Sequence, residues 1–225
     1  MTTALEQYTV NRAAGPIPAD ARWDAPEWEA APPLRLTRWM GDRPAHFPTV
    51  QAKLLYDDLS LHVIFRVQDR YVRAVVADYQ GPVCTDSCAE LFLTPEPGVD
   101  NGYFNIEVNC GGTMLFKHQL ARDTETVPVS QDDARSLAVA ATLPRRVEPE
   151  RTEPTEWCVR YRVPYSVLER YAPVTRPAPG VHWRANLYKC GDLTSHPHWL
   201  TWAEVKWEKP DFHRREFFGE LLFGE

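Results

Sequence analysis

The chain has 225 residues, of which 44% are hydrophobic, enough to bury one sizeable core. Its formal net charge of −6 provides no basic surface of the kind that binds nucleic acid, so we expect no nucleic-acid partner. No run approaches the length of about 18 apolar residues that a membrane-spanning helix needs, so no membrane partner is expected either.

The first 30 residues are rich in Pro, Ala and Trp, and prolines every few residues argue against a long helix there. We expect residues 1–30 to form an irregular leader that Trp23 and Trp28 fasten to the rest of the chain. The leader has no cationic segment followed by an apolar one, and the five cysteines match no zinc-site spacing. Buried, reduced thiols and a cytoplasmic location are therefore predicted.

Two strands are predicted over residues 49–56 and 59–69, on either side of the turn-forming pair Asp57-Asp58. A second pair, over 83–93 and 103–116, is the most informative part of the sequence. Its side chains alternate between apolar and polar, and a period of two places each kind on its own face. The face expected in the core carries Leu91, Phe104, Ile106 and Val108. The opposite face carries Asp86, Cys88, Glu90, Asn105, Glu107 and Asn109.

The second half of the chain predicts a polar connection over 117–135 and further short strands. These strands are expected at 137–143, 157–163, 181–190 and 216–223. One short helix is expected to open at Pro164, because proline is tolerated in the first turn. The pattern indicates an all-β fold, an antiparallel β-sandwich of the jelly-roll kind with one short helix and long loops, as a single domain over 1–225.

The row of amides and carboxylates on the second strand pair favours a binding function. Glu and Asn side chains offer fixed hydrogen-bond acceptors and donors for sugar hydroxyls, or an oxygen-rich site for a hard cation. A polar sheet face without a ligand is the alternative that this pattern leaves open.

Five motifs occur in an order that resembles the family 9-like carbohydrate-binding modules, over about residue 15 to the end. They are VCTDSCAELFL, GYFNIEVNCGGTMLF, VPYSVL, WRANLYKCGD and WLTWAEV with PDFHRREFFGELLF. The resemblance implies a β-sandwich that binds mono- or oligosaccharides, including the chain ends of plant-type glycans, often with structural calcium. In that family two tryptophans clamp the terminal glucose or xylose unit.

The resemblance also assigns candidate residues. The second clamp tryptophan falls on Trp202, the strand glutamate on Glu90, and the polar partners of the next strand on Asn105 and Glu107. The first clamp position is Cys84, and a thiol has no flat aromatic face. A two-sided clamp would therefore need Tyr79 or Tyr103 as a replacement.

A sugar site combines an aromatic face, on which ring C–H groups pack, with charged and amide groups for the hydroxyls. Trp199, Trp202 and Trp207 lie close together in sequence, and Trp207 is expected in the core. The candidate ligand-binding residues are Trp202, Glu90, Asn105, Glu107, Arg184, Asn186, Tyr79 and Tyr103.

Two other functions stay open. Asp86, Glu90 and Glu107 could supply the two carboxylates of a glycan-active hydrolase. Related sandwiches bind haem through a Met with a Lys or His, and Met114, Lys117 and His118 are close in sequence. The sequence assigns no metal ligands and no oligomeric state, and a partner-binding or unliganded module is a further alternative.

Overall fold

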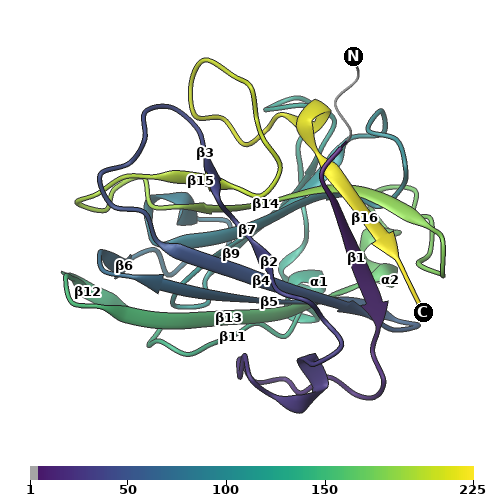
Figure 1. The fold of residues 1–225 in the computed structure, drawn as a ribbon. Helices are drawn as coiled ribbons and strands as arrows, with labels where there is room; N and C mark the ends of the chain where they lie inside the picture. Colours follow the sequence, from purple (N-terminus) through teal and green to yellow (C-terminus); the bar gives the residue numbers. More distant parts are fainter. Residues whose placement is uncertain (1–4) are drawn as a thin grey trace.

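The computed structural model describes residues 5–225, which form two packed β-sheets joined at a shared strand (Figure 1). The first sheet has the order β10 (Val127–Pro128), β9 (Met114–Gln119), β8 (Tyr103–Asn109), β7 (Cys88–Thr94), β14 (His182–Cys190), β16 (Gly219–Phe223), β1 (Gln7–Arg12). The second continues from β1 through β4 (Thr49–Tyr56), β5 (Ser60–Asp69), β13 (Thr155–Pro164) and β11 (Ala140–Ala141).

Smaller elements extend this framework. Strand β2 (Leu34–Arg35) pairs with β4, while β15 (Trp199–Thr201) pairs with both β14 and β3 (Arg38–Trp39). Strands β6 (Val72–Ala74) and β12 (Val147–Arg151) form a separate two-stranded sheet. The helices are α1 (Gln131–Arg135) and α2 (Tyr165–Leu168), with single 3-10 turns at Pro26–Trp28, Val83–Thr85 and Arg215–Phe217. No helix within residues 5–225 has the length and apolar character needed to cross a membrane.

The antiparallel β-sandwich is confirmed, and the main core lies between the two sheets. Leu91, Phe104, Ile106 and Val108 are all fully buried in it, as their alternation predicts. The outer face of the second sheet is covered by the segment that carries Trp23 and Trp28, which are buried against Leu55 and Ile64. Both tryptophans therefore anchor this segment as expected.

Several sequence predictions differ from the structure. Trp207, expected in the core, is 47% exposed, and the strand expected at 137–143 is only the two residues of β11. The leader is not wholly irregular, because β1 pairs in parallel with both β16 and β4. The first strand of the central pair begins at Cys88, since Val83–Thr85 form a 3-10 turn. The expected strand 103–116 is a hairpin of β8 and β9, and Gly112 at its turn has a φ of 86° that glycine tolerates. Helix α1 lies inside the segment expected to be a polar connection, where Ser130 caps it.

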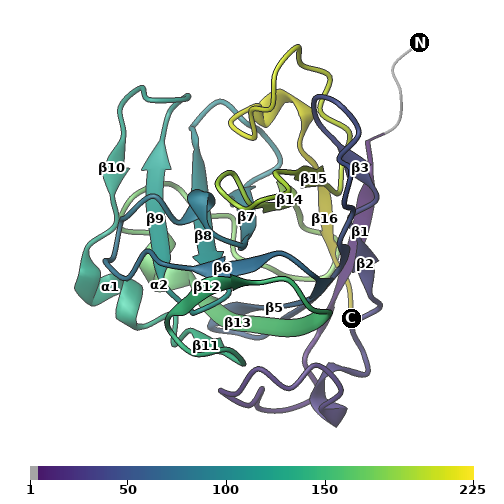
Figure 2. The same ribbon diagram turned by 90° about the vertical axis from the view of Figure 1, so that its left-hand side faces the viewer.

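The outer face of the first sheet is also buried, which the alternation alone does not predict. Every residue of β7 and β8 is buried, whichever face of the sheet its side chain lies on. Figure 2 shows the yellow-green segment between β15 and β16 lying beyond β14 and β15, on the side away from β5 and β13. Phe212 and Phe218 from this segment pack with Phe92, Tyr103 and Tyr188 of the sheet in a second apolar cluster.

Candidate functional site

Strand pairing brings the polar residues of the first sheet into rows on its outer face. Glu90 of β7 lies directly opposite Glu107 of β8 and, on its other side, opposite Tyr188 of β14. In the neighbouring row Cys88 lies opposite Cys190 of β14. The predicted adjacency of the two central strands is therefore confirmed, and so is the shared face of Glu90 and Glu107.

A pocket of about 140 Å³ opens over these rows, between the sheet and the loops that cover it. Its floor comes from β7, β8 and β14, and its walls come from segments near residues 84, 122, 192 and 210–213. The lining residues are Cys84, Glu90, Glu107, Arg122, Cys190, Asp192, Trp199, Pro210, Asp211, Phe212 and His213.

Burial disfavours the ionised form of the carboxyl groups on the pocket floor. Burial, followed by the charge of Glu107, raises the pKa of Glu90 well above its ordinary value. Burial also raises the pKa of Glu107 to about 7, against a hydrogen bond from Asn105 that lowers it. Burial also raises the pKa of Asp192 at the pocket wall. Near neutral pH the pair therefore offers both a protonated carboxyl, which donates, and an ionised one, which accepts.

The aromatic wall of the pocket is Trp199 rather than Trp202. Trp199 pairs with Cys190 and shares its outward direction, and its Nε1 donates to Asp192 Oδ1 at 2.8 Å. Trp202 follows three residues later, and its backbone N–H donates to Leu187 O. An odd separation along an extended chain reverses the direction of the side chain. Trp202 therefore points into the main core, only 5% exposed, and our assignment of it as a binding platform is wrong.

Three other predicted residues support the pocket from outside it. Asn105 donates to Glu107 Oε1 at 2.9 Å and holds that carboxylate in place. The Asn186 side chain is fully buried and bonds both the N–H and the carbonyl of Ala203. The Arg184 guanidinium donates to the carbonyls of Phe218 and Gly219. Asn186 and Arg184 thus fasten the covering segment to the sheet, and none of the three lines the pocket.

Neither tyrosine replaces the missing clamp residue. Tyr103 is fully buried, and its hydroxyl lies 2.7 Å from His213 Nδ1. Tyr79 donates to Val129 O and lines a different cavity beside Met114. Cys84 does line the candidate pocket, so the position where the family resemblance expects a tryptophan is at the site and carries a thiol.

Asp86 does not belong to the pocket, which removes one of the three carboxylates proposed for a hydrolase. It is fully buried and accepts from the backbone N–H groups of Val75 and Val76 and from Asn109 Nδ2. Its other oxygen lies 3.3 Å from the Arg73 guanidinium. These contacts make Asp86 a structural residue, because all its acceptor sites face the protein interior.

The three residues proposed for haem binding do not converge. Met114 and Lys117 lie an odd number of positions apart on β9, so they occupy opposite faces of the sheet. Met114 is buried in the main core. The His118 side chain lies within hydrogen-bond distance of Asn101 O and packs against Phe104. The haem hypothesis is therefore not supported by this arrangement.

Sequence reasoning missed the wall residues, because they lie in loops without periodicity. Arg122 forms an ion pair with Asp211 at 2.6 Å, and Asp211 also pairs with Arg214. His213 stands over Tyr103, and burial, then the charge of Arg122, lowers its pKa to about 4. In the sequence, Asp211 and His213 stand out only through the PDFH motif of the family resemblance.

The β-sandwich has the fold of solved carbohydrate-binding modules. The model of carbohydrate-binding family 9 matches residues 15–223. The chain therefore belongs to carbohydrate-binding family 9. A search of curated proteins gave no match.

Solved structures share the fold over almost the whole chain. A protein from Bacteroides uniformis ATCC 8492, assigned as carbohydrate-binding, is 25% identical with a TM-score of 0.86, covering 98% of this chain and 100% of that one. A family 9 module from Caldicellulosiruptor kristjanssonii in complex with cellotriose is 13% identical with a TM-score of 0.64, covering 97% and 94%. A family 9 module from Caldicellulosiruptor kristjanssonii in complex with glucose is 13% identical with a TM-score of 0.62, covering 98% of this chain and 97% of that one.

Proposed function

We propose that this protein binds a sugar without catalysing a reaction, in the pocket between Glu90, Glu107 and Trp199. The single observation that carries this proposal is the joining of two opposed carboxyl groups and an aromatic wall in one pocket, in a chain of carbohydrate-binding family 9. The mono- or oligosaccharide ends of plant-type glycans are the ligands we propose to test first.

The two glutamates suit vicinal hydroxyl groups. Directly opposed residues of an antiparallel pair have Cβ atoms about 4.5–5.5 Å apart, so two carboxyl groups can meet neighbouring hydroxyls on one ring. Asn105 fixes Glu107, and the Cys190 thiol lies 3.0 Å from Glu90 Oε1. Because these side chains are already ordered, ordering them costs less free energy when a ligand binds.

Trp199 suits the apolar face of the same ring. Its indole is half-buried, and the hydrogen bond to Asp192 fixes its orientation at the pocket wall. Sugar C–H groups pack on such faces, and a single platform of this kind supports weak binding, with a Kd of about 0.1–1 mM.

Calorimetric titration with glucose, xylose and cello- or xylo-oligosaccharides tests the proposal. Trp199→Ala should weaken binding by about 1–2 kcal/mol, tenfold or more. Glu107→Gln should cost a similar amount, because hydrogen bonds to a charged acceptor are the stronger ones, and Glu90→Gln should cost less, because burial favours the neutral form of its carboxyl.

Trp39→Ala is the matched control. Trp39 is 41% exposed and lies on β3, next to β15, but it does not line the pocket. Its loss should leave the affinity unchanged. The proposal fails if none of the sugars binds, or if the Trp199 and Trp39 variants bind equally well.

A further inference from the structure

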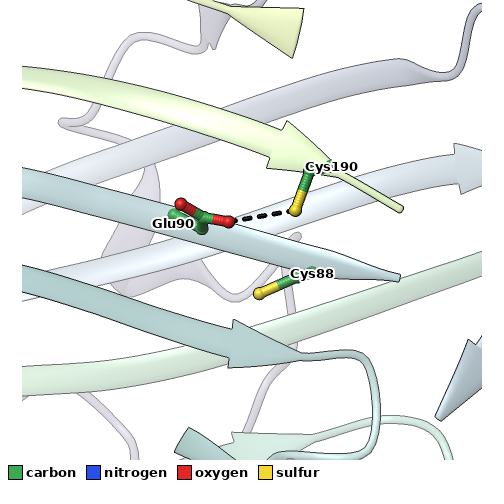
Figure 3. A group of neighbouring side chains, drawn as sticks. All are labelled: Cys88, Glu90 and Cys190. Carbon is green, nitrogen blue, oxygen red and sulfur yellow. Dashed lines mark hydrogen bonds between the residues drawn. The ribbon is translucent and has the colours of Figure 1, made fainter. Parts of the chain in front are cut away.

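Two thiols and a carboxyl group lie together on β7 and β14 (Figure 3). Cys88 and Cys190 are direct partners across β7 and β14, and Glu90 follows Cys88 on the same face of β7. One ligand atom from each of these three residues lies within 4.8 Å of the other two. Within residues 5–225 this is the one group of three or more His, Cys, Asp or Glu side chains with that property.

The surroundings leave Glu90 short of hydrogen-bond donors. Its side chain is only 2% exposed, and the hydrogen bond found for it among the described residues comes from the Cys190 thiol. A thiol is a weak donor, so the ionised form of Glu90 lacks the two or three stronger bonds that stabilise a buried carboxylate. The electrostatic environment is also unfavourable, because Glu107 faces Glu90 directly. A cation at this position would satisfy the carboxylate and both sulfurs together.

The chemistry of the donor set selects the cation. Calcium prefers six to eight oxygen ligands, so this cluster does not suit the calcium that the family resemblance implies. Thiolates with one carboxylate suit Zn²⁺, whose ligand bonds of about 2.3 Å to sulfur and 2.0 Å to oxygen place tetrahedral ligand atoms about 3.5–3.8 Å apart. Cys190 Sγ and Glu90 Oε1 lie 3.0 Å apart and would have to separate by about 0.5 Å to reach those values, and all the ligand atoms already lie within 4.8 Å of one another.

We infer that Cys88, Cys190 and Glu90 form a site for Zn²⁺ or a similar thiophilic divalent cation. Binding replaces the two thiol protons, and the carboxyl proton of Glu90 where it carries one, with the metal ion and releases these protons to solvent. Cys190 and Glu90 line the pocket, which gives the ion a path of entry. Water from the pocket can fill a fourth ligand position. This inference rests on the cluster alone and does not depend on sugar binding.

Cobalt(II) is the probe, added without sugar to protein that has been reduced and treated with a chelator. Thiolate ligation should give a sulfur-to-cobalt charge-transfer band at a stoichiometry of one ion per chain, and Zn²⁺ should displace it. Cys88→Ser combined with Cys190→Ser should abolish the band. Glu90→Gln should weaken binding by more than about 100-fold, since changes even outside the ligand shell cost about 10–100-fold.

Cys158→Ser is the matched control, because Cys158 is a buried free thiol of β13 in a different apolar cluster. It should leave the cobalt band unchanged. The absence of a charge-transfer band in the wild-type protein would overturn the inference, whatever the folding of the variants. A band that survives in the folded Glu90→Gln variant at unchanged affinity would remove Glu90 from the site. Sugar titrations are separate, so either proposal can fail without the other.

Discussion

Glu90 and Glu107 lie directly opposite each other on adjacent antiparallel strands, with side chains of which no more than 5% is exposed. Burial raises the pKa of Glu107 to about 7, from an ordinary value of 4.5. The folded protein therefore keeps a proton that the unfolded chain loses above pH 4.5. By linkage, this group makes the free energy of unfolding fall as the pH rises from 4.5 to about 7.

Glu107→Gln should remove that effect. Between pH 5 and 6.5, the slope of unfolding free energy against pH should become more positive than in the wild type by up to about 1.4 kcal/mol per pH unit. Urea unfolding at several pH values, in the presence of a chelator, measures the slope. An unchanged slope would contradict a raised pKa at Glu107.

His213 should change the dependence of the unfolding free energy on pH in the opposite direction to Glu107. Burial, followed by the positive charge of Arg122, lowers its pKa from 6.5 to about 4. The unfolded chain binds the proton first, so stability falls as the pH drops from 6.5 towards 4. His213→Gln should flatten the wild-type dependence by up to about 1.4 kcal/mol per pH unit over pH 4.5–6. The same urea experiment tests this, and an equal acid sensitivity in the variant would show that His213 is not protected.

The two nearby tryptophans should separate stability from binding. Trp202 packs on Gly219 within the main core, so Trp202→Ala should cost about 3–5 kcal/mol of stability. For a chain of this size that lowers the melting temperature by roughly 6–20 °C. Trp199 is only half-buried, and Trp199→Ala should cost about 1–2 kcal/mol. Calorimetric melting of both variants decides, and equal losses would contradict the opposite directions of the two side chains.

Asp86 should matter for folding, since it accepts three N–H groups and lies beside Arg73. Asp86→Asn should cost about 2–4 kcal/mol, because an amide replaces a buried, hydrogen-bonded charge. Asp132→Asn is the matched control. It removes an exposed ion pair with Arg135, and its effect should stay within about 0.5 kcal/mol. Chemical unfolding of the two variants should therefore differ clearly, and similar values would mean that Asp86 is not a structural residue.

The sequence predicts most of the sandwich where alternation is clean. Strand β4 has the expected bounds, and β5 begins one residue after its expected start. Alternation also places Glu90 and Glu107 on one face, because strand period alone determines that. It cannot say whether the face is open, since the cover comes from residues more than 100 positions away, such as Phe212 and His213.

The sequence also cannot predict which tryptophan forms the aromatic wall of the pocket. Trp199 and Trp202 have the same chemistry and neighbouring positions, and the family resemblance selects Trp202. Only the pairing of β15 with β14 decides which indole faces the pocket, because a shift of one residue exchanges the two faces. The loop residues Arg122 and Asp192 carry no periodic signal, so their place at the site depends entirely on tertiary structure.

The position of β1 has a consequence for how the protein is made. Residues 7–10 pair with 220–223 of β16, and β1 also pairs with β4, so one early strand joins the two sheets. During synthesis this strand emerges long before its partner in β16. A nascent chain can therefore assemble the β4–β5 hairpin early, but the first sheet stays open beside β14 until residue 223 has left the ribosome. Until then the unpaired edge of β14 is exposed, and binding by chaperones should be strongest in this interval.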